Sequence, residues 1–254
     1  MNPLVQRAAD ESRAADSKVD QFFERVEQVL GFVPEPLRHL IEAIRLGLVA
    51  LEEKIRDFQE RIAGLWEQRG DADRLRQVGE RWVAEVGDVL GDIAAGIAPD
   101  KLRTAVEWEG RAARAYQLAV PPQAAGLNAV KDIANQLRAS LNSLANSLDV
   151  FWLSISFALA GFVVGAVVAI AAACTVVGIP AAIAALATAV ATSLAVVGAT
   201  VLALESHFNT IETEQAAIRQ KVHDLGSTWS APNTADMADA SVTDGDGSDW
   251  RPGS

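Results

Sequence analysis

The side chains able to carry acid–base, nucleophilic or metal chemistry are few in this chain and lie far apart in the sequence. The three histidines are His39, His207 and His223, and the single cysteine is Cys174. A zinc site needs several Cys or His ligands at short, defined spacings, which these four residues do not have. The sequence also lacks a phosphate-binding loop, a dinucleotide fingerprint and a nucleophile elbow. We therefore expect a non-enzymatic protein with no catalytic, cofactor or metal site.

The charge and composition narrow the class of protein further. Acidic pairs such as Glu52–Glu53 and Glu212/Glu214 lie among other polar residues, which is typical of solvated helix faces. The net charge of −11 argues against a nucleic-acid partner, because phosphate binding needs a basic surface. Ala, Val and Leu dominate the apolar half of the composition, and aromatic residues make up only 6%. This bias favours helices, so the sequence predicts an all-α fold, an elongated helical bundle.

The strongest pattern is an uncharged stretch from Val150 to Leu204, which contains no Asp, Glu, Lys, Arg or His. A spanning helix needs about 20 apolar residues, so this stretch holds two, with a turn at Gly178 and Pro180. The sequence predicts a hydrophobic two-helix transmembrane hairpin over residues 150–204, with helices at about 151–176 and 180–204. A lipid bilayer is then the expected partner and a membrane the expected location, with Trp152 as an interfacial anchor. The alternative is a water-soluble bundle in which other helices cover both apolar helices.

Small residues recur at four-residue steps on both helices of this hairpin. They let helix backbones approach closely in lipid, where packing drives association. The two helices are expected to pair with each other, or alternatively with another chain in a homo- or hetero-oligomer. The hairpin tip carries no charge, so it can cross a bilayer while both flanking arms stay on one side. The predicted packing residues are Gly161, Gly165, Ala169, Ala173, Ala181, Ala185, Ala189 and Ser193.

Amphipathic helices are predicted over residues 1–69. The first covers about 17–31, with a break at Pro34 and Pro36. A heptad helix follows at 37–68, either as part of a bundle within the chain or as an intermolecular coiled coil. The N-terminus has no apolar core of signal-peptide length, so no cleavable signal peptide is expected. The heptad positions are Leu37, Ile41, Ile44, Leu48, Leu51, Ile55, Phe58, Ile62 and Leu65.

The region 70–149 is expected to form a helical hairpin. Its first helix ends near Pro99, its second is interrupted at Pro121–Pro122, and a Leu-striped helix follows over 123–149. After the apolar stretch the sequence predicts an amphipathic helix at 205–226. The segment 227–254 is rich in Ser, Asp, Gly and Thr and is expected to be a disordered acidic tail.

Within the region 70–149, Trp108, Gly110 and the small-residue run to Tyr116 resemble the WXG family. These are small helical hairpins exported by type VII (ESX) secretion systems of actinobacteria and firmicutes. The resemblance covers about a third of the chain. It implies dimerisation through the hairpin with a WXG partner and recognition by a secretion ATPase.

The chain departs from the family pattern in its export signal, which is usually Tyr-x-x-x-Asp/Glu after the second helix. The only tyrosine is Tyr116, and its fourth successor is Val120. Phe208 and Glu212 have the required spacing, with Phe in place of Tyr, and are the candidate secretion signal.

The sequence thus predicts a type VII secretion-associated protein that inserts its hairpin into a membrane as an effector or channel-forming component. In architecture it is similar to α-helical pore-forming toxins. One alternative is a resident two-span membrane scaffold for a neighbouring toxin or secretion substrate. Another is a soluble protein whose own long helices cover the hairpin.

Overall fold

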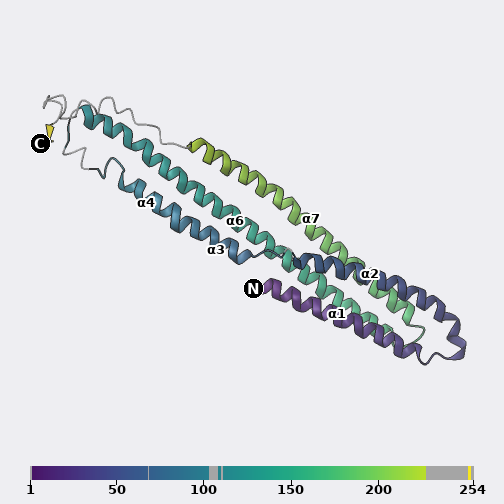
Figure 1. The fold of residues 1–254 in the computed structure, drawn as a ribbon. Helices are drawn as coiled ribbons and strands as arrows, with labels where there is room; N and C mark the ends of the chain where they lie inside the picture. Colours follow the sequence, from purple (N-terminus) through teal and green to yellow (C-terminus); the bar gives the residue numbers. More distant parts are fainter. Residues whose placement is uncertain (1, 68, 103–107, 110, 227–250, 253–254) are drawn as a thin grey trace. The chain divides into compact units, whose positions relative to one another are not determined.

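A computed structural model describes residues 2–67, 69–102, 108–109, 111–226 and 251–252 (Figure 1). It confirms the all-α class: nearly all described residues are helical, apart from one two-residue strand pair. The elements are α1 (Pro3–Leu30), η1 (Glu35–Leu40), α2 (Ile41–Glu67), α3 (Ala72–Trp82), η2 (Val83–Gly87), α4 (Asp88–Gly96), β1 (Trp108–Glu109), α6 (Arg111–Ala172), α7 (Ile179–Leu225) and β2 (Arg251–Pro252).

The chain forms two compact units, each assembled from segments distant in the sequence. Unit 1 combines residues 1–73 with 144–209, and unit 2 combines 74–143 with 210–254. Unit 1 is a bundle of four helical segments, from α1, α2, the C-terminal part of α6 and the N-terminal part of α7. One continuous cluster of buried apolar side chains joins all four segments. The predicted apolar hairpin is therefore part of a packed bundle.

Helix α1 begins much earlier than the sequence pattern predicts. It starts at Pro3, where the Asn2 side chain caps the helix by accepting a hydrogen bond from the Leu4 backbone N–H at 2.9 Å. The prediction of a start near residue 17 is wrong. Small residues such as Ala8 and Ala15 are buried on the inward face and give only a weak hydropathy signal. The buried residues of α1 are Val5, Ala8, Ala15, Val19, Phe22 and Val26.

Helix α2 carries the predicted heptad stripe, and the stripe packs within the chain. Its buried residues are Ile44, Leu51, Ile55, Phe58 and Ile62, all of them predicted heptad positions. They belong to the same core cluster as the buried residues of α1, α6 and α7. Of the two environments expected for this helix, the structure therefore shows the intramolecular bundle.

The predicted break at Pro121–Pro122 is wrong, because α6 runs through both prolines. Each proline removes one intrahelical hydrogen bond, which would free the carbonyl groups of Gln117 and Leu118. Both prolines are exposed, and Leu118 is 78% exposed, so water can solvate those carbonyls. Similarly, the predicted helix at 205–226 is the continuation of α7 without a break.

In unit 2, the helical run through α3, η2 and α4 lies antiparallel to α6. A Cβ added at Gly79 would lie 3.2 Å from the Arg138 Cα, and one at Gly87 would lie 3.1 Å from the Ala134 Cβ. The glycines thus allow close helix contact. The π-helical turn η2 lies within this run. The exposed Arg81 guanidinium donates to the Glu85 carboxylate at 2.9 Å and lowers the pKa of that carboxyl group.

The C-terminal part of α7 completes unit 2. The Ser140 hydroxyl donates to the Glu214 carboxylate, and Lys221 Nζ donates to Gln136 Oε1 at 2.7 Å. Strands β1 and β2 pair antiparallel, with Trp108 opposite Pro252 and Glu109 opposite Arg251. Unit 2 therefore consists of helices around α6 with one short strand pair.

Candidate membrane-insertion site

The apolar hairpin consists of the C-terminal part of α6, a turn, and the N-terminal part of α7. Both helices contain a window long and apolar enough to cross a membrane, with mean hydropathies of 2.5 and 2.0. Only 39% of the window in α6 and 28% of the window in α7 is buried within the protein. A core helix of a soluble protein would be mostly buried, so this hairpin is only partly covered.

The turn between the two helices depends on Gly178. A Cβ at this position would lie 2.1 Å from the Ala172 carbonyl oxygen, so no other residue fits without a backbone shift. The Gly178 N–H donates to the Thr175 carbonyl at 3.0 Å, and its own carbonyl accepts from the Ala182 N–H at 2.9 Å. Gly178 thus lies at the turn, and Pro180 is exposed in the first turn of α7.

The two helices of the hairpin pack through small residues. A Cβ added at Gly165 would lie 2.5 Å from the Ala189 Cβ, so the glycine allows close helix approach. The buried Ser193 hydroxyl donates across the hairpin to the Ala158 carbonyl at 3.0 Å. Ala169 and Ala173 are fully buried, and Ala185 is half-buried.

Gly161 and Ala181 are the two predicted packing residues that the structure leaves exposed. A Cβ at Gly161 would meet no atom within 4 Å. The reason is geometric, because each four-residue step advances about 40° around an α-helix. Over the three steps from Gly161 to Ala173 the row turns by about 120°, so its ends cannot both face the same neighbour.

Helices α1 and α2, which we call the cover, pack over one face of the hairpin. The rings of Phe58 on α2 and Phe162 on α6 lie 5.1 Å apart, and Phe22 of α1 is fully buried in the same core. On the other helix of the hairpin, Ile183 lies against α2, with its Cδ1 atom 3.2 Å from a Cβ added at Gly47. Because these contacts are apolar, the burial of apolar surface stabilises the packing of the cover on the hairpin.

One aromatic contact and two hydrogen bonds connect the cover to the start of the apolar stretch. The Trp66 and Trp152 rings stack with centroids 4.7 Å apart, and Trp152 Nε1 donates to the Arg69 carbonyl at 3.1 Å. Asn2 Nδ2 donates to the Asp149 carboxylate at 2.9 Å, which fastens the beginning of α1. Trp152 is only 2% exposed, so in this structure it lies in the core and not at a surface.

The opposite face of the hairpin is uncovered. Its exposed apolar residues recur at helical spacing and include the end of the hairpin turn. The guanidinium of Arg7 lies 5.5 Å from the Phe157 ring centroid at the edge of this face. Exposed apolar side chains gathered on one face are typical of sites of protein or membrane contact. The exposed residues are Val150, Phe157, Val164, Val167, Val168, Val177, Val196 and Leu202.

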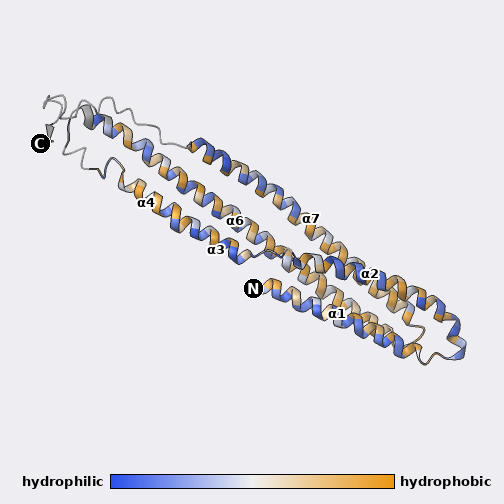
Figure 2. Ribbon diagram, viewed as in Figure 1, coloured by the Kyte–Doolittle hydropathy of each residue, from blue (hydrophilic) through white to orange (hydrophobic). Residues whose placement is uncertain are grey.

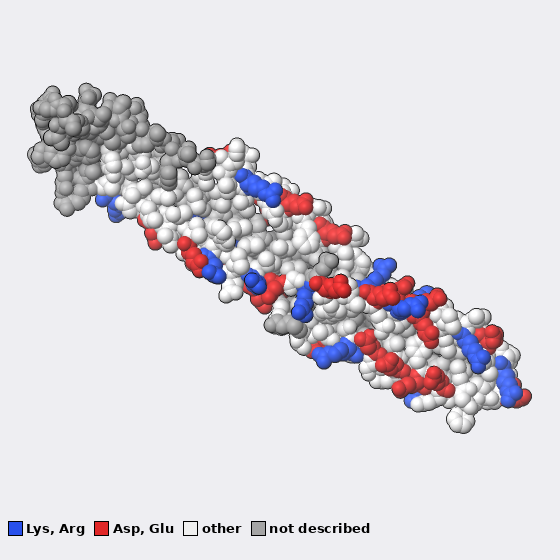
Figure 3. All heavy atoms as spheres, in the orientation of Figure 1, with Lys and Arg blue, Asp and Glu red and all other residues white. Residues whose placement is uncertain are grey.

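The outward surfaces of α1 and α2 are highly charged, in contrast to the hairpin. Ten of the 28 residues of α1 and ten of the 27 residues of α2 are Asp, Glu, Lys or Arg. Figure 2 shows hydrophilic residues alternating with apolar ones along both helices, and Figure 3 shows acidic and basic side chains over them. Unit 1 therefore joins two highly charged amphipathic helices with two long apolar ones.

Comparison with protein-family models, with curated proteins and with solved structures finds no match to this chain. The site must therefore be interpreted from its own chemistry. Among the described residues, no group of three or more His, Cys, Asp or Glu side chains is placed to hold a metal ion.

The residues of the predicted WXG-like turn are only partly described. The backbone of Trp108 lies in β1 and Tyr116 is half-buried on α6, whereas Gly110 lies outside the described residues. The candidate secretion residues Phe208 and Glu212 are both exposed on α7. The predicted tail, 227–254, also lies almost entirely outside the described part of the chain.

The contact between Trp66 and Trp152 is a feature that the sequence pattern missed. The only signal was positional, since Trp66 lies near the end of the heptad stripe and Trp152 near the start of the apolar stretch. Nothing in either local pattern indicates that the two indoles meet.

Proposed function

We propose that this protein inserts its apolar hairpin into a lipid bilayer, and that α1 and α2 cover one face of the hairpin beforehand. The supporting observation is the low burial of the two apolar windows, 39% and 28%, next to amphipathic helices that occupy only one side. The exposed apolar face offers the first contact with lipid. The uncharged tip of the hairpin then crosses the bilayer. Asp149 and Glu205 are the charged residues that flank the apolar stretch.

The cover cannot accompany the hairpin into the bilayer. Each Asp, Lys or Arg at the centre of a spanning helix costs roughly 2.5–3.5 kcal/mol, and α1 and α2 carry many of them. Insertion therefore requires these helices to separate from the hairpin and remain at the water side. This argument favours regulated insertion over a resident two-span protein that has the same bundle within the membrane.

Unit 2 supports the second part of the proposal, an association with type VII secretion. The run of α3, η2 and α4 lies antiparallel to α6, as in the helical hairpins that the WXG-like residues resemble. In this proposal unit 2 binds a WXG partner or a secretion ATPase. The protein then acts as a secreted effector or channel-forming component, and Phe208 and Glu212 serve as its export signal.

A disulfide that locks the cover tests insertion directly. Gly47→Cys and Ile183→Cys are combined in a Cys174→Ser background, because Gly47 and Ile183 are in contact between α2 and α7. With phosphatidylcholine–phosphatidylglycerol vesicles, the oxidised protein is expected to bind only through its exposed apolar face and to leave the hairpin sensitive to protease. Reduction is expected to restore insertion, measured as protection of the hairpin from protease.

The matched control is Gly47→Cys alone in the same background, under the same oxidising conditions. It should insert whether oxidised or reduced. If the locked double variant inserts as fast as this control, the cover does not need to open and that part of the proposal is wrong. If no form ever binds vesicles, insertion itself is wrong.

Export is tested by expressing the chain beside a type VII secretion system with an active or an inactive ATPase. Secretion into the medium is expected only with the active ATPase, and Phe208→Ala or Glu212→Ala should abolish it. Leu202→Ala changes another exposed residue of α7 and should leave export unchanged. Export that persists without the ATPase would contradict this part of the proposal.

A further inference from the structure

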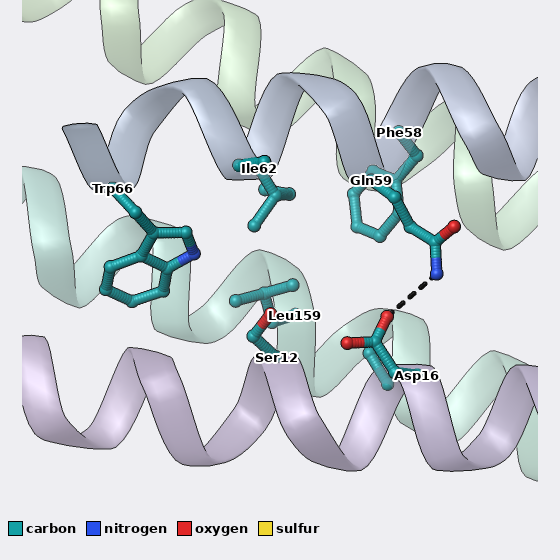
Figure 4. A pocket seen from close by; sticks show the side chains of 9 residues that line it. Ser12, Asp16, Phe58, Gln59, Ile62, Trp66 and Leu159 are labelled. Carbon is teal, nitrogen blue, oxygen red and sulfur yellow. Dashed lines mark hydrogen bonds between the residues drawn. The ribbon is translucent and has the colours of Figure 1, made fainter.

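A pocket of about 340 Å³ lies in unit 1 between α1 and α2, with α6 behind it (Figure 4). This volume is at the lower end of the range of about 300–1,000 Å³ for small-molecule sites. The inner wall is apolar and formed by the buried side chains of Phe58, Ile62 and Leu159. The half-buried Trp66 closes one end. The pocket therefore suits an aliphatic chain.

The mouth of the pocket is polar and presents hydrogen-bond acceptors. Gln59 Nε2 donates to Asp16 Oδ1 at 2.8 Å across it, which links α2 to α1. The second carboxylate oxygen of Asp16, Gln59 Oε1 and the Ser12 hydroxyl can each accept a hydrogen bond. Asp16 is the one charged residue among the nine that line the pocket, so its carboxylate supplies the charge of the lining.

We propose that this pocket binds a small cationic amphiphile, an aliphatic chain that carries a protonated amine. The chain lies against Phe58, Ile62 and Leu159, and the ammonium group donates to the Asp16 carboxylate and the Gln59 carbonyl oxygen. The complementarity is of two kinds, apolar area in the interior and negative charge at the mouth.

The location of the pocket couples this ligand to the covered form. Its walls come from α1, α2 and α6 together, so the site exists only while the cover is closed. A ligand that binds one state alone shifts the equilibrium towards it. At a free concentration ten times its Kd, it lowers the uncovered population about elevenfold. This coupling rests on the proposed function, whereas binding itself does not.

Calorimetric titration of the full chain with octylammonium, octanol and octanoate, without membranes, tests the site. Octylammonium is expected to bind with one site per chain, octanol more weakly and octanoate weakest. Hexylammonium should bind more weakly than octylammonium by up to about fifteenfold, since each buried methylene contributes about fourfold. Equal heats for all three head groups would overturn the proposal, because they would indicate unspecific partition onto the exposed apolar face.

Two pairs of variants assign the binding to the pocket. Ala63→Leu fills it and should abolish binding, whereas Ala50→Leu, on the same helix outside the pocket, should not. Asp16→Asn should reduce the affinity for octylammonium about threefold to fivefold and leave octanol unchanged. Asp20→Asn, one turn further along α1, should have no effect. Unchanged binding in Ala63→Leu would overturn the assignment.

Vesicle flotation of the same protein separates the two proposals. If octylammonium binds in the pocket and slows insertion, both the site and the coupling hold. Pocket binding without any insertion in the absence of ligand sinks the proposed function and leaves the site standing. Insertion without pocket binding overturns the proposed site and leaves the proposed function standing.

Discussion

Trp66 and Trp152 lie 86 positions apart in the sequence, yet their indole rings stack with centroids 4.7 Å apart. Trp152 also donates its indole N–H to the Arg69 carbonyl, just beyond the end of α2. The start of the apolar stretch is therefore fastened to the end of the cover by one aromatic and one polar contact.

Replacing Trp152 with Phe retains a ring but removes the indole N–H. Water then replaces the indole as donor to the carbonyl of the exposed Arg69, and we expect a loss of about 0.5–1.5 kcal/mol in the free energy of unfolding. Urea unfolding followed by circular dichroism measures the change. Trp82→Phe is the control, since Trp82 is 46% exposed and should change stability by less than about 0.5 kcal/mol. Equal effects in the two variants would contradict the role of this contact.

Gly161 and Gly165, two of the predicted packing residues, are expected to respond in opposite directions to alanine. Gly161→Ala adds a methyl group in open space within a helix and should stabilise the protein by about 0.5–1 kcal/mol. Gly165→Ala forces that group against Ala189 and should destabilise it by about 1–3 kcal/mol. Thermal unfolding of both variants gives the signs. A gain of stability in both would show that α6 and α7 do not approach closely at Gly165.

A charge at the hairpin tip is expected to block insertion. Val177 is 65% exposed, so Val177→Asp should fold normally, but its carboxylate would have to cross the bilayer. A penalty of about 3 kcal/mol at the middle of the bilayer corresponds to insertion that is over a hundredfold slower. Val49→Asp is the matched control on the cover, where Val49 is 56% exposed. Quenching of a fluorophore on the exposed Cys174 by lipid-bound quenchers reports how deep the tip lies.

A cavity in the cover is expected to favour insertion at the expense of stability. Phe22 is fully buried on α1, and Phe22→Ala should lower the free energy of unfolding by about 3–5 kcal/mol. The same change weakens the cover, so vesicle binding should become faster. Phe32→Ala removes a ring that is 89% exposed and should alter neither property. Slower vesicle binding in Phe22→Ala would mean that α1 assists insertion instead of restraining it.

The heptad helix was predictable because its signal is local and strong. Large aliphatic side chains such as Leu51, Ile55 and Ile62 recur at alternating steps of three and four, and they are the residues buried on α2. The uncharged hairpin and its turn at Gly178 were predictable for the same reason.

The start of α1 and the path of α6 were not predictable from local patterns. Alanines such as Ala8 and Ala15 pack in the core without contrasting with their neighbours in hydropathy. Pro121 and Pro122 are strong helix breakers on average, but exposure on the solvent side makes the lost hydrogen bonds tolerable. Context outweighs propensity in both cases.

The cover and the pocket depend on contacts between distant segments. Asp16 meets Gln59 and Asn2 meets Asp149 only because the bundle brings these helices together. Periodicity identifies which face of a helix is apolar, but it does not identify which neighbour that face contacts. The candidate site could therefore be located from the sequence, while its covered face could not.

Ser156 is fully buried in the bundle, and its hydroxyl meets no hydrogen-bond partner within the described part of the chain. A buried polar group in this condition costs about 1–3 kcal/mol. The closed bundle is thus less stable, by about this amount, than the same bundle would be with the hydroxyl satisfied.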